Sequence, residues 1–196
     1  ASGFVGRELI PHLAKANLEL LLVGRDPVKL KKLFPEQNAI FYEDIETEGC
    51  DYDALVHLAV MNNDQNKKLD EFRAVNVILL KSVLNSAQAA GIKTFINTAT
   101  LHTSKRSDLS NYTQTKREAE HLLSNAKGIA IVNLRLPAVY GKNFSGKLTI
   151  LNKLPSFLRP IVFQFLTSFK PTVNVKVISE EIQDVTLKVI STETIV

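Results

Sequence analysis

The sequence predicts an α/β fold with a doubly wound parallel sheet, and two observations support this prediction. The first is a set of short aliphatic runs, typical of strands buried on both faces, at 18–23, 54–60, 94–98 and 129–134. The second is apolar residues at helical spacing between the runs, at 5–16, 70–90 and 112–125. Strands that alternate with helices need crossover connections, and these produce a parallel sheet.

The first element is a glycine turn, Gly3-Phe4-Val5-Gly6, which leads directly into the helix at 5–16. In a dinucleotide-binding turn, one glycine allows close backbone approach to the pyrophosphate and the next allows tight packing of helix on strand. The helix N-terminus also offers free N–H groups to phosphates. Gly-x-x-Gly before a helix occurs in ordinary tight turns too, so this pattern alone leaves both interpretations open.

The strand at 18–23 ends in Gly24-Arg25-Asp26, at the position where such folds contact the adenosine ribose. An acidic residue at this tip favours NAD, whereas Gly24 followed by Arg25 suits the 2′-phosphate of NADP through bidentate hydrogen bonds. Asp26 complicates this interpretation, and a surface arginine in a turn is the alternative. We expect NADP as the cofactor, with NAD possible.

The helix at 112–125 begins with Tyr112 and Lys116, which are about one turn apart and share a face. A phenol is a poor base at neutral pH, and a nearby ammonium lowers its pKa enough to make proton exchange with a hydroxyl substrate feasible. Tyr-x-x-x-Lys is common on amphipathic helices, so the order of the surrounding motifs matters more than the pair.

Two threonines lie just upstream, at the carboxyl edge of the sheet where ligands bind in such folds. Thr100 is expected to orient the substrate oxygen together with Tyr112, and Thr98 is assigned to the cofactor site. Downstream, an apolar loop at 134–141 that contains Pro137 is expected to flank the nicotinamide.

In this order along 3–141, the motifs resemble those of the extended short-chain dehydrogenases/reductases, the group that contains nucleotide-sugar epimerases and dehydratases. The resemblance implies a Rossmann fold in which Gly3 and Gly6 are the last two glycines of the opening turn. It implies further cofactor contacts from Asp44, Ile45, Leu58, Ala59 and Val60. It also implies that Asn76 supports a proton relay whose catalytic residues are Thr100, Tyr112 and Lys116, and that the helices at 70–90 and 112–125 form a homodimer contact.

The chain departs from the family pattern directly after Thr100. Dehydratases of the family have an Asp-Glu pair there, and decarboxylating relatives have a glutamate, whereas this chain has Leu101-His102. Dehydration is therefore disfavoured. His102 is a candidate for contact with the substrate, and no metal site is predicted, because His12 and His121 have no ligand partners at useful spacing.

We expect two parts: a dinucleotide-binding Rossmann domain at 1–141 and a partial, compact substrate-binding portion at 142–196. A doubly wound domain normally opens with a strand that leads into the glycine turn, so one further strand is expected before this turn. Beyond residue 141 the strand–helix alternation stops, and a short strand at 173–177 and a helix at 180–191 follow.

Composition narrows the class of protein. The net charge is only +4 and no dense basic block is present, so nucleic-acid binding is not expected. Cys50 is the only cysteine, which excludes an intramolecular disulfide and favours a reducing compartment. The chain shows no signal peptide, and the apolar stretch at 157–169 is too short and interrupted to span a bilayer. We expect a cytoplasmic location.

Two functions remain open. The first is an NAD(P)-dependent epimerase or ketoreductase that acts on a nucleotide-sugar or a similar hydroxyl or keto compound through the Thr-Tyr-Lys relay. The second is an atypical relative that binds NADP(H) as a structural or sensing module in a larger assembly, with the stretch at 157–169 as a docking surface. Retention of Thr100, Tyr112, Lys116 and Asn76 favours the enzyme, because a binding module does not need the relay.

Overall fold

The structure is a computed structural model that describes residues 1–62, 67–104, 107–141 and 172–193. The first half of the chain contains α1 (Phe4–Lys15), β1 (Leu21–Val23), α2 (Pro27–Leu33), β2 (Asn38–Ile40), α3 (Ile45–Glu48) and β3 (Ala54–His57). The second half contains α4 (Leu69–Arg73), the π-helix η1 (Ala74–Leu79), α5 (Leu80–Ala89), β4 (Thr94–Thr100), the 3₁₀-helix η2 (Leu101–Ser104), α6 (Asn111–Ser124), β5 (Ala130–Leu136), β6 (Ala138–Tyr140), β7 (Thr172–Asn174) and α8 (Val175–Glu193). The apolar stretch at 157–169 lies outside the described residues.

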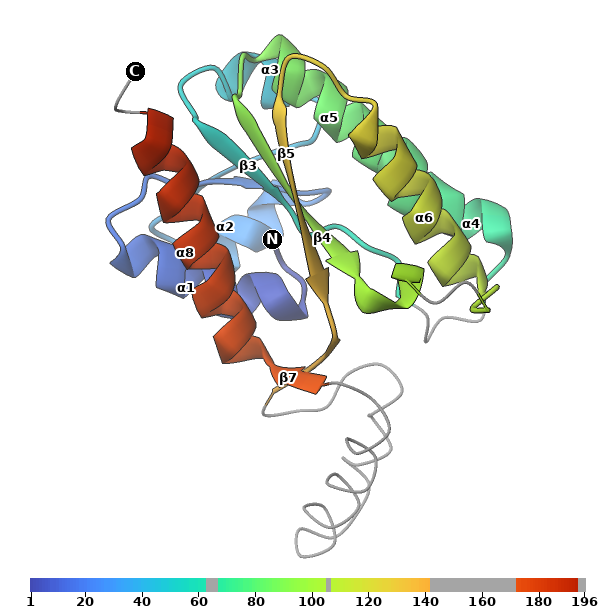
Figure 1. Ribbon diagram of the computed structural model, residues 1–196. Coiled ribbons are helices and arrows are strands. Elements are labelled where there is room, and N and C mark those ends of the chain that lie inside the picture. Colours follow the sequence, from blue (N-terminus) through green and yellow to red (C-terminus); the bar gives the residue numbers. More distant parts are fainter. Residues whose placement is uncertain (63–66, 105–106, 142–171, 194–196) are drawn as a thin grey trace, which may run out of the picture.

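Every strand pair among the described residues is parallel, which confirms the predicted fold class. The central sheet has the order β3-β4-β5, and its register places Ala54 beside Thr94 and Thr94 beside Ala130. Strands β1 and β2 form a second parallel pair, and β6 and β7 form a third. In Figure 1, α5 and α6 lie on one side of the central sheet and α1 and α8 lie on the other.

Alternation along the central strands sorts their side chains between these two helical layers. Leu55, Phe95 and Ile131 pack with Leu80, Val83 and Ala119 of α5 and α6. Val56 and Leu134 point to the opposite face and pack with Leu9 of α1 and Ile182 of α8. Apolar residues on both faces explain why the strands appear in the sequence as nearly continuous aliphatic runs.

The carboxyl end of the chain corrects one sequence-based prediction. A strand was expected at 173–177, but β7 ends at Asn174 and α8 begins at Val175. Alternating valines at 173, 175 and 177 imitate a strand, yet the Asn174 side chain accepts a hydrogen bond from the Lys176 N–H, as a helix cap does. Val175, Ile178 and Ile182 are then buried at helical spacing. Tertiary packing against α1 therefore decides the local structure.

The prediction of a loop at 134–141 is also wrong. β5 continues to Leu136 and β6 covers Ala138–Tyr140, so Pro137 alone separates the two strands. A proline has no N–H for the ladder, which explains the break at this residue. Sequence reasoning also missed α2, β2 and α3, which are short elements of three to seven residues.

Among the described residues, β1 and β3 belong to separate sheets. A cavity of about 360 Å³ lies between them, and aliphatic side chains from both strands line it, including Leu22 and Val56. No described helix is long and apolar enough to cross a membrane.

The glycine turn yields a matched pair of stability predictions. A Cβ at Gly6 would collide with the backbone of Ala1, whereas nothing lies within 4 Å of a Cβ at Gly3. We expect Gly6→Ala to lower the free energy of unfolding by about 1–3 kcal/mol, as other overpacked sites do. Gly3→Ser, which keeps a favoured helix-capping residue, is expected to change it by less than about 0.5 kcal/mol. Urea unfolding of both variants tests this, and equal stabilities would contradict it.

Candidate active site

The first turn of α6 is fixed by its cap. The Ser110 hydroxyl accepts a hydrogen bond from the Thr113 N–H at 3.3 Å, and the Ser110 N–H donates to Asp108 Oδ1 at 3.1 Å. Because α6 starts at Asn111, Tyr112 and Lys116 both lie in its first two turns. The helix thus presents both side chains toward the carboxyl end of β4.

Tyr112 hydrogen-bonds the side chain of Thr100, which is buried at 5% exposure. The same Thr100 hydroxyl accepts the backbone N–H of His102 at 3.3 Å. Burial raises the pKa of the Tyr112 phenol, and the hydrogen bond with Thr100 opposes this only in part. The phenol is therefore protonated at neutral pH and is suited to donate a proton.

Lys116 is 3% exposed, and its ammonium donates a hydrogen bond to the Thr98 carbonyl oxygen at 2.8 Å. Burial lowers the pKa of Lys116 to about 8, and the negative charge of Glu120 opposes the shift. The ammonium is held against the backbone of β4, and burial dominates the pKa of Tyr112. In this arrangement burial outweighs any effect of Lys116 on the pKa of Tyr112, and the lowering of this pKa by Lys116 stays a prediction.

Asn76 is 2% exposed and lies in the π-helix η1. Its amide exchanges two hydrogen bonds with Met61, accepting from the Met61 N–H at 2.8 Å and donating to the Met61 carbonyl at 3.2 Å. It also donates to the Thr115 hydroxyl at 3.1 Å. Asn76 thus joins the segment after β3 to the helix that carries Tyr112 and Lys116.

Sequence reasoning missed Thr115, which is fully buried at 0% exposure. Its hydroxyl lies 2.9 Å from the Asn111 carbonyl and 3.0 Å from the Tyr112 carbonyl, so it fixes the turn in which Tyr112 stands. The available signal was a hydroxyl residue directly before Lys116. Its partner Asn76 is 39 residues away in the sequence, so local periodicity could not identify this contact.

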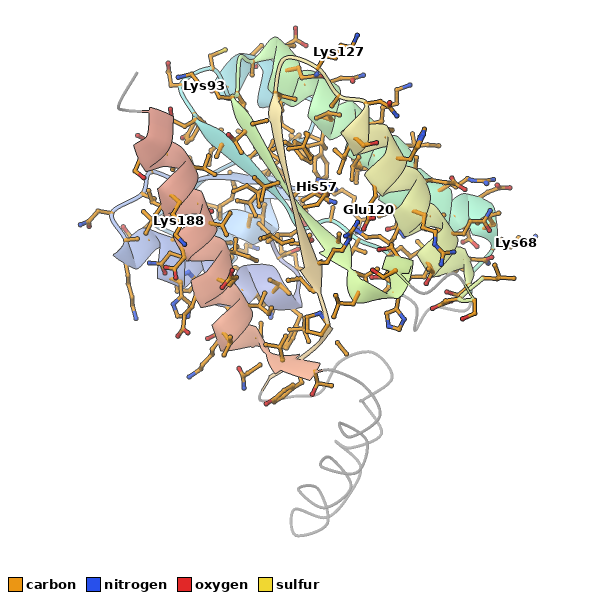
Figure 2. All side chains as sticks on the ribbon, viewed as in Figure 1. His57, Lys68, Lys93, Glu120, Lys127 and Lys188 are labelled. Carbon is orange, nitrogen blue, oxygen red and sulfur yellow. The ribbon has the colours of Figure 1, made fainter. Side chains whose placement is uncertain are left out.

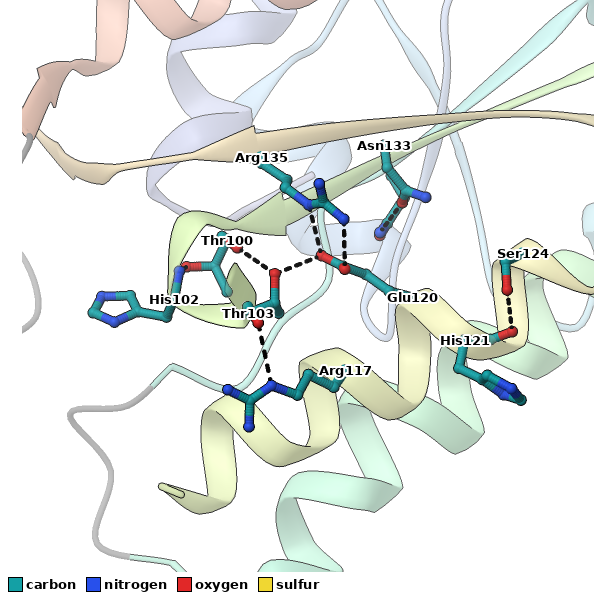
Figure 3. Close-up of polar contacts among 10 residues, drawn as sticks. Thr100, His102, Thr103, Arg117, Glu120, His121, Ser124, Asn133 and Arg135 are labelled. Carbon is teal, nitrogen blue, oxygen red and sulfur yellow. Dashed lines mark hydrogen bonds and ion pairs between the residues drawn. The ribbon is translucent and has the colours of Figure 1, made fainter. Parts of the chain in front are cut away.

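A polar network holds η2 and also was not predicted. Glu120 binds the Arg135 guanidinium, with 3.0 Å between its Oε2 and Arg135 Nη2, and lies 2.9 Å from the Thr103 hydroxyl (Figure 3). Arg117 donates to the Thr103 carbonyl at 3.2 Å. His102 Nδ1 lies 3.2 Å from the Asp108 carboxylate. These contacts position the segment that follows Thr100.

The glycine turn has the features of a phosphate-binding helix start. Gly3 precedes the first turn of α1, its carbonyl accepts the Arg7 N–H at 3.0 Å, and the space beside it is open. Gly6 lies against the Ala1 backbone. Val5 packs in one apolar cluster with Leu58, while Phe4 lies against Gly141. The turn and the segment after β3 thus pack against the same apolar cluster.

At the tip of β1, Arg25 is exposed and its charge acts on the partly buried Tyr42. The Asp26 carboxylate caps α2 by accepting the Lys29 N–H at 2.9 Å. Asp44 accepts the Phe41 N–H at 3.2 Å, and Ile45 is buried. Arg25 and Asp26 are the two charged residues between which the sequence left the choice of NADP or NAD open. Of these two, Asp26 has a structural role as the cap of α2.

The remaining predicted cofactor residues lie at the ends of the central strands. Leu58, Ala59 and Val60 follow β3 and are half-buried. Thr98 lies in β4, where its hydroxyl donates to the His57 carbonyl at 3.1 Å. Pro137 follows β5 and is half-buried. Gly24 donates its N–H to the Ile40 carbonyl at 3.1 Å, which ties the tip of β1 to β2.

The lowered pKa of Lys116 predicts a stability effect with a defined pH range. Below pH 8 the lysine is protonated in both the folded and the unfolded chain, so burial of its charge costs stability in full. As the pH rises from about 8 to 10.5, the folded chain releases the proton first and this cost disappears. Lys116→Met should therefore be stabilised relative to wild type most strongly at pH 7, and the gain should vanish near pH 10.5. Urea unfolding at several pH values measures it.

The exposed Lys81 supplies the control. Lys81→Met is expected to differ from wild type by the same amount at pH 7 and near pH 10.5. A gain for Lys116→Met that does not change with pH would show that burial does not lower the pKa of Lys116.

Comparisons with known proteins identify the family and the fold. A model of the NAD dependent epimerase/dehydratase family matches residues 1–164. CDP-abequose synthase of Salmonella typhimurium strain LT2 is 28% identical over 159 residues, which cover 72% of this chain and 52% of that protein. The chain thus spans about half the length of this curated relative.

Two solved structures are similar in fold. One is UDP-N-acetylglucosamine 4-epimerase from Bacillus cereus, with a TM-score of 0.68, 19% identity and coverage of 91% of this chain and 66% of that one. The other is the Bordetella bronchiseptica enzyme WbmG in complex with NAD and UDP, with a TM-score of 0.62, 21% identity and coverage of 77% and 56%. Because the family model covers most of the sequence, the chain belongs to the NAD dependent epimerase/dehydratase family.

Proposed function

We propose that this chain is the cofactor-binding part of an epimerase or ketoreductase that acts on a hydroxyl or keto group of a nucleotide-linked sugar or a similar compound. The observation that carries the proposal is the hydrogen bond between Tyr112 and Thr100 at the carboxyl end of β4, with the buried Lys116 one turn away. The similarity to a CDP-abequose synthase and to epimerase structures supports this class of substrate.

The residues of the site fit a dinucleotide. The open space beside Gly3, the start of α1 and the half-buried segment 58–60 provide a place for pyrophosphate and for the nicotinamide. When bound, the cofactor supplies or accepts a hydride. Arg25 is the cation suited to a 2′-phosphate, and with Asp26 used as a helix cap we propose NADP as the preferred form.

The chain's own residues handle the proton. In the reducing direction the protonated Tyr112 donates its proton to the carbonyl oxygen of the substrate, and Thr100 orients that oxygen by a second hydrogen bond. In the oxidising direction the phenolate must accept the proton from the substrate hydroxyl. Lys116, which is charged at neutral pH, stabilises this phenolate once its ammonium turns from the Thr98 carbonyl. Leu101 offers no acid or base for the elimination of water.

Tyr112→Phe tests the proposed proton transfer. Removal of the hydroxyl should lower kcat by about 10²–10⁴-fold, the usual contribution of a general acid, while the cofactor Kd stays within about twofold. The measurement is turnover of the full-length protein with a panel of nucleotide-linked keto sugars, together with calorimetric binding of the cofactor.

Tyr52→Phe is the matched control, because the Tyr52 hydroxyl faces Glu19 at 3.4 Å, away from the relay. Wild-type turnover by Tyr112→Phe would overturn the assignment. If the wild-type protein binds the cofactor and turns over none of the panel, the hypothesis of an NADP(H)-binding structural or sensing module is favoured instead.

Arg25→Ala tests the choice of cofactor. Wild-type protein should bind NADP⁺ more tightly than NAD⁺ by about 1.4 kcal/mol or more, a factor of ten, and the variant should lose this preference. Lys31→Ala removes a positive charge from α2 whose ammonium bonds the Gln37 carbonyl, and should keep the preference. Calorimetric titration measures both. Tighter binding of NAD⁺ by wild type would show that NAD is the cofactor.

A further inference from the structure

A row of polar side chains crosses the central sheet beneath α6. His57, Asn97 and Asn133 are neighbours in the strand register, one on each of β3, β4 and β5. Each lies two residues beyond an apolar residue that packs against α5 and α6, so all three share that face. Figure 2 shows His57 in the interior of the fold. The sheet face that meets α6 is thus apolar at its start and polar at its carboxyl end.

Two atoms of this row are buried without a hydrogen-bond partner: His57 Nε2 and Asn97 Oδ1. The side chains are 4% and 0% exposed, so solvent does not satisfy them. The His57 ring stacks on Phe95 at 5.6 Å between centroids, which fixes its orientation. Its other nitrogen donates to the Ala59 carbonyl, and burial lowers its pKa to about 3, so the ring is neutral and Nε2 is an acceptor.

The Lys116 ammonium contacts the backbone at the same end of the central strands. It donates to the carbonyl of Thr98, the residue after Asn97, and the Thr98 hydroxyl donates to the carbonyl of His57. A lysine ammonium has three N–H donors, and the Thr98 carbonyl is the acceptor that the described residues give it. The charge of Lys116 also acts on the His57 ring. The unused donors of Lys116 and the two unused acceptors on β3 and β4 therefore belong to the same end of the central sheet.

One water molecule balances these groups. Such a water would accept one N–H from Lys116 and donate its two hydrogens to His57 Nε2 and Asn97 Oδ1, and it would then have three polar partners, the number typical of a buried water. We propose that His57 and Asn97 form a buried water site through which they position the Lys116 ammonium. His57 and Asn97 act on Lys116 and not on the substrate, so they are positioning residues.

This site would set both the direction and the charge of Lys116. The charge that acts on the ammonium is that of Glu120 on α6, which is bound to Arg135 on β5. The charges that act on the His57 ring are those of Lys116 and of the N-terminal amine. A neutral His57 adds an acceptor without adding a repelling charge. The benefit for catalysis rests on the proposed function, in which a charged Lys116 stabilises the Tyr112 phenolate; the water site itself does not depend on it.

The test is the pKa of Lys116, which is measured by an NMR titration of protein labelled at lysine Cε. The Lys116 signal is assigned by comparison with Lys116→Met. His57→Phe keeps the stacked ring and Asn97→Leu keeps the side-chain size, but each removes one acceptor. Each should lower the pKa of Lys116 by about one unit, a tenfold change in its protonation equilibrium. His57→Gln, whose amide oxygen replaces the acceptor, should restore the wild-type value. Ile96→Val, a buried change on the opposite face of β4, should leave it unchanged.

A crystal structure of the wild-type protein gives an independent readout. It should show a water within about 2.7–3.2 Å of Lys116 Nζ, His57 Nε2 and Asn97 Oδ1. A dry site, or a Lys116 pKa that neither His57→Phe nor Asn97→Leu changes, would overturn the proposal. Each acceptor is removed separately, so a variant that fails to fold leaves the other one to decide. If the pKa shifts as expected but the protein shows no turnover, the water site stands and the proposed enzyme activity fails.

Discussion

The arrangement of the whole site depends on the burial of one charged side chain, Lys116, against the carboxyl end of β4. Its ammonium is 2.8 Å from the Thr98 carbonyl and is almost fully removed from solvent. A charge in such a place needs acceptors, and these are supplied by backbone and neutral polar groups. The same rotation of α6 about its axis buries Ala119 and Leu123, one and two turns after Lys116, so any other rotation would expose these two apolar residues.

Once α6 is fixed in this way, the other contacts of the site follow. Tyr112, one turn before Lys116, contacts Thr100, which is two residues beyond Thr98 in β4. Thr115 meets Asn76, and Asn76 in turn holds the backbone of Met61. Glu120, one turn after Lys116, meets Arg135 on β5. One helix thus connects the ends of β3, β4 and β5, and the proposed cofactor and substrate residues lie along this edge.

The sequence was sufficient for the fold class and for the spacing of Tyr112 and Lys116, because both follow from local periodicity. It was insufficient wherever the decisive partner is remote in the chain. Arg73 and Glu118, which join α4 to α6 with 2.8 Å between Nη2 and Oε1, are 45 residues apart. The raised pKa of Tyr112 has the same origin, since burial depends on the packing of several elements. At 173–177 the valine alternation predicted a strand, whereas α8 begins at Val175 and its residues Ile178 and Ile182 pack with Leu9 and Leu13 of α1.

The π-helix between α4 and α5 determines which face of α4 and which face of α5 are buried on the same side. A π-turn closes its hydrogen bond one residue later than an α-turn, so it changes the phase of everything that follows it. Phe72 before the π-turn, Asn76 within it and Leu80 after it are all buried, at intervals of four residues. Deletion of a single residue within Ala74–Leu79 would restore α-helical geometry and shift Asn76 relative to one of the two flanking helices, and with it the hydrogen bonds to Met61. The length of this segment, as much as its composition, is therefore under constraint: the chain would tolerate substitution there more readily than a change of one residue in length.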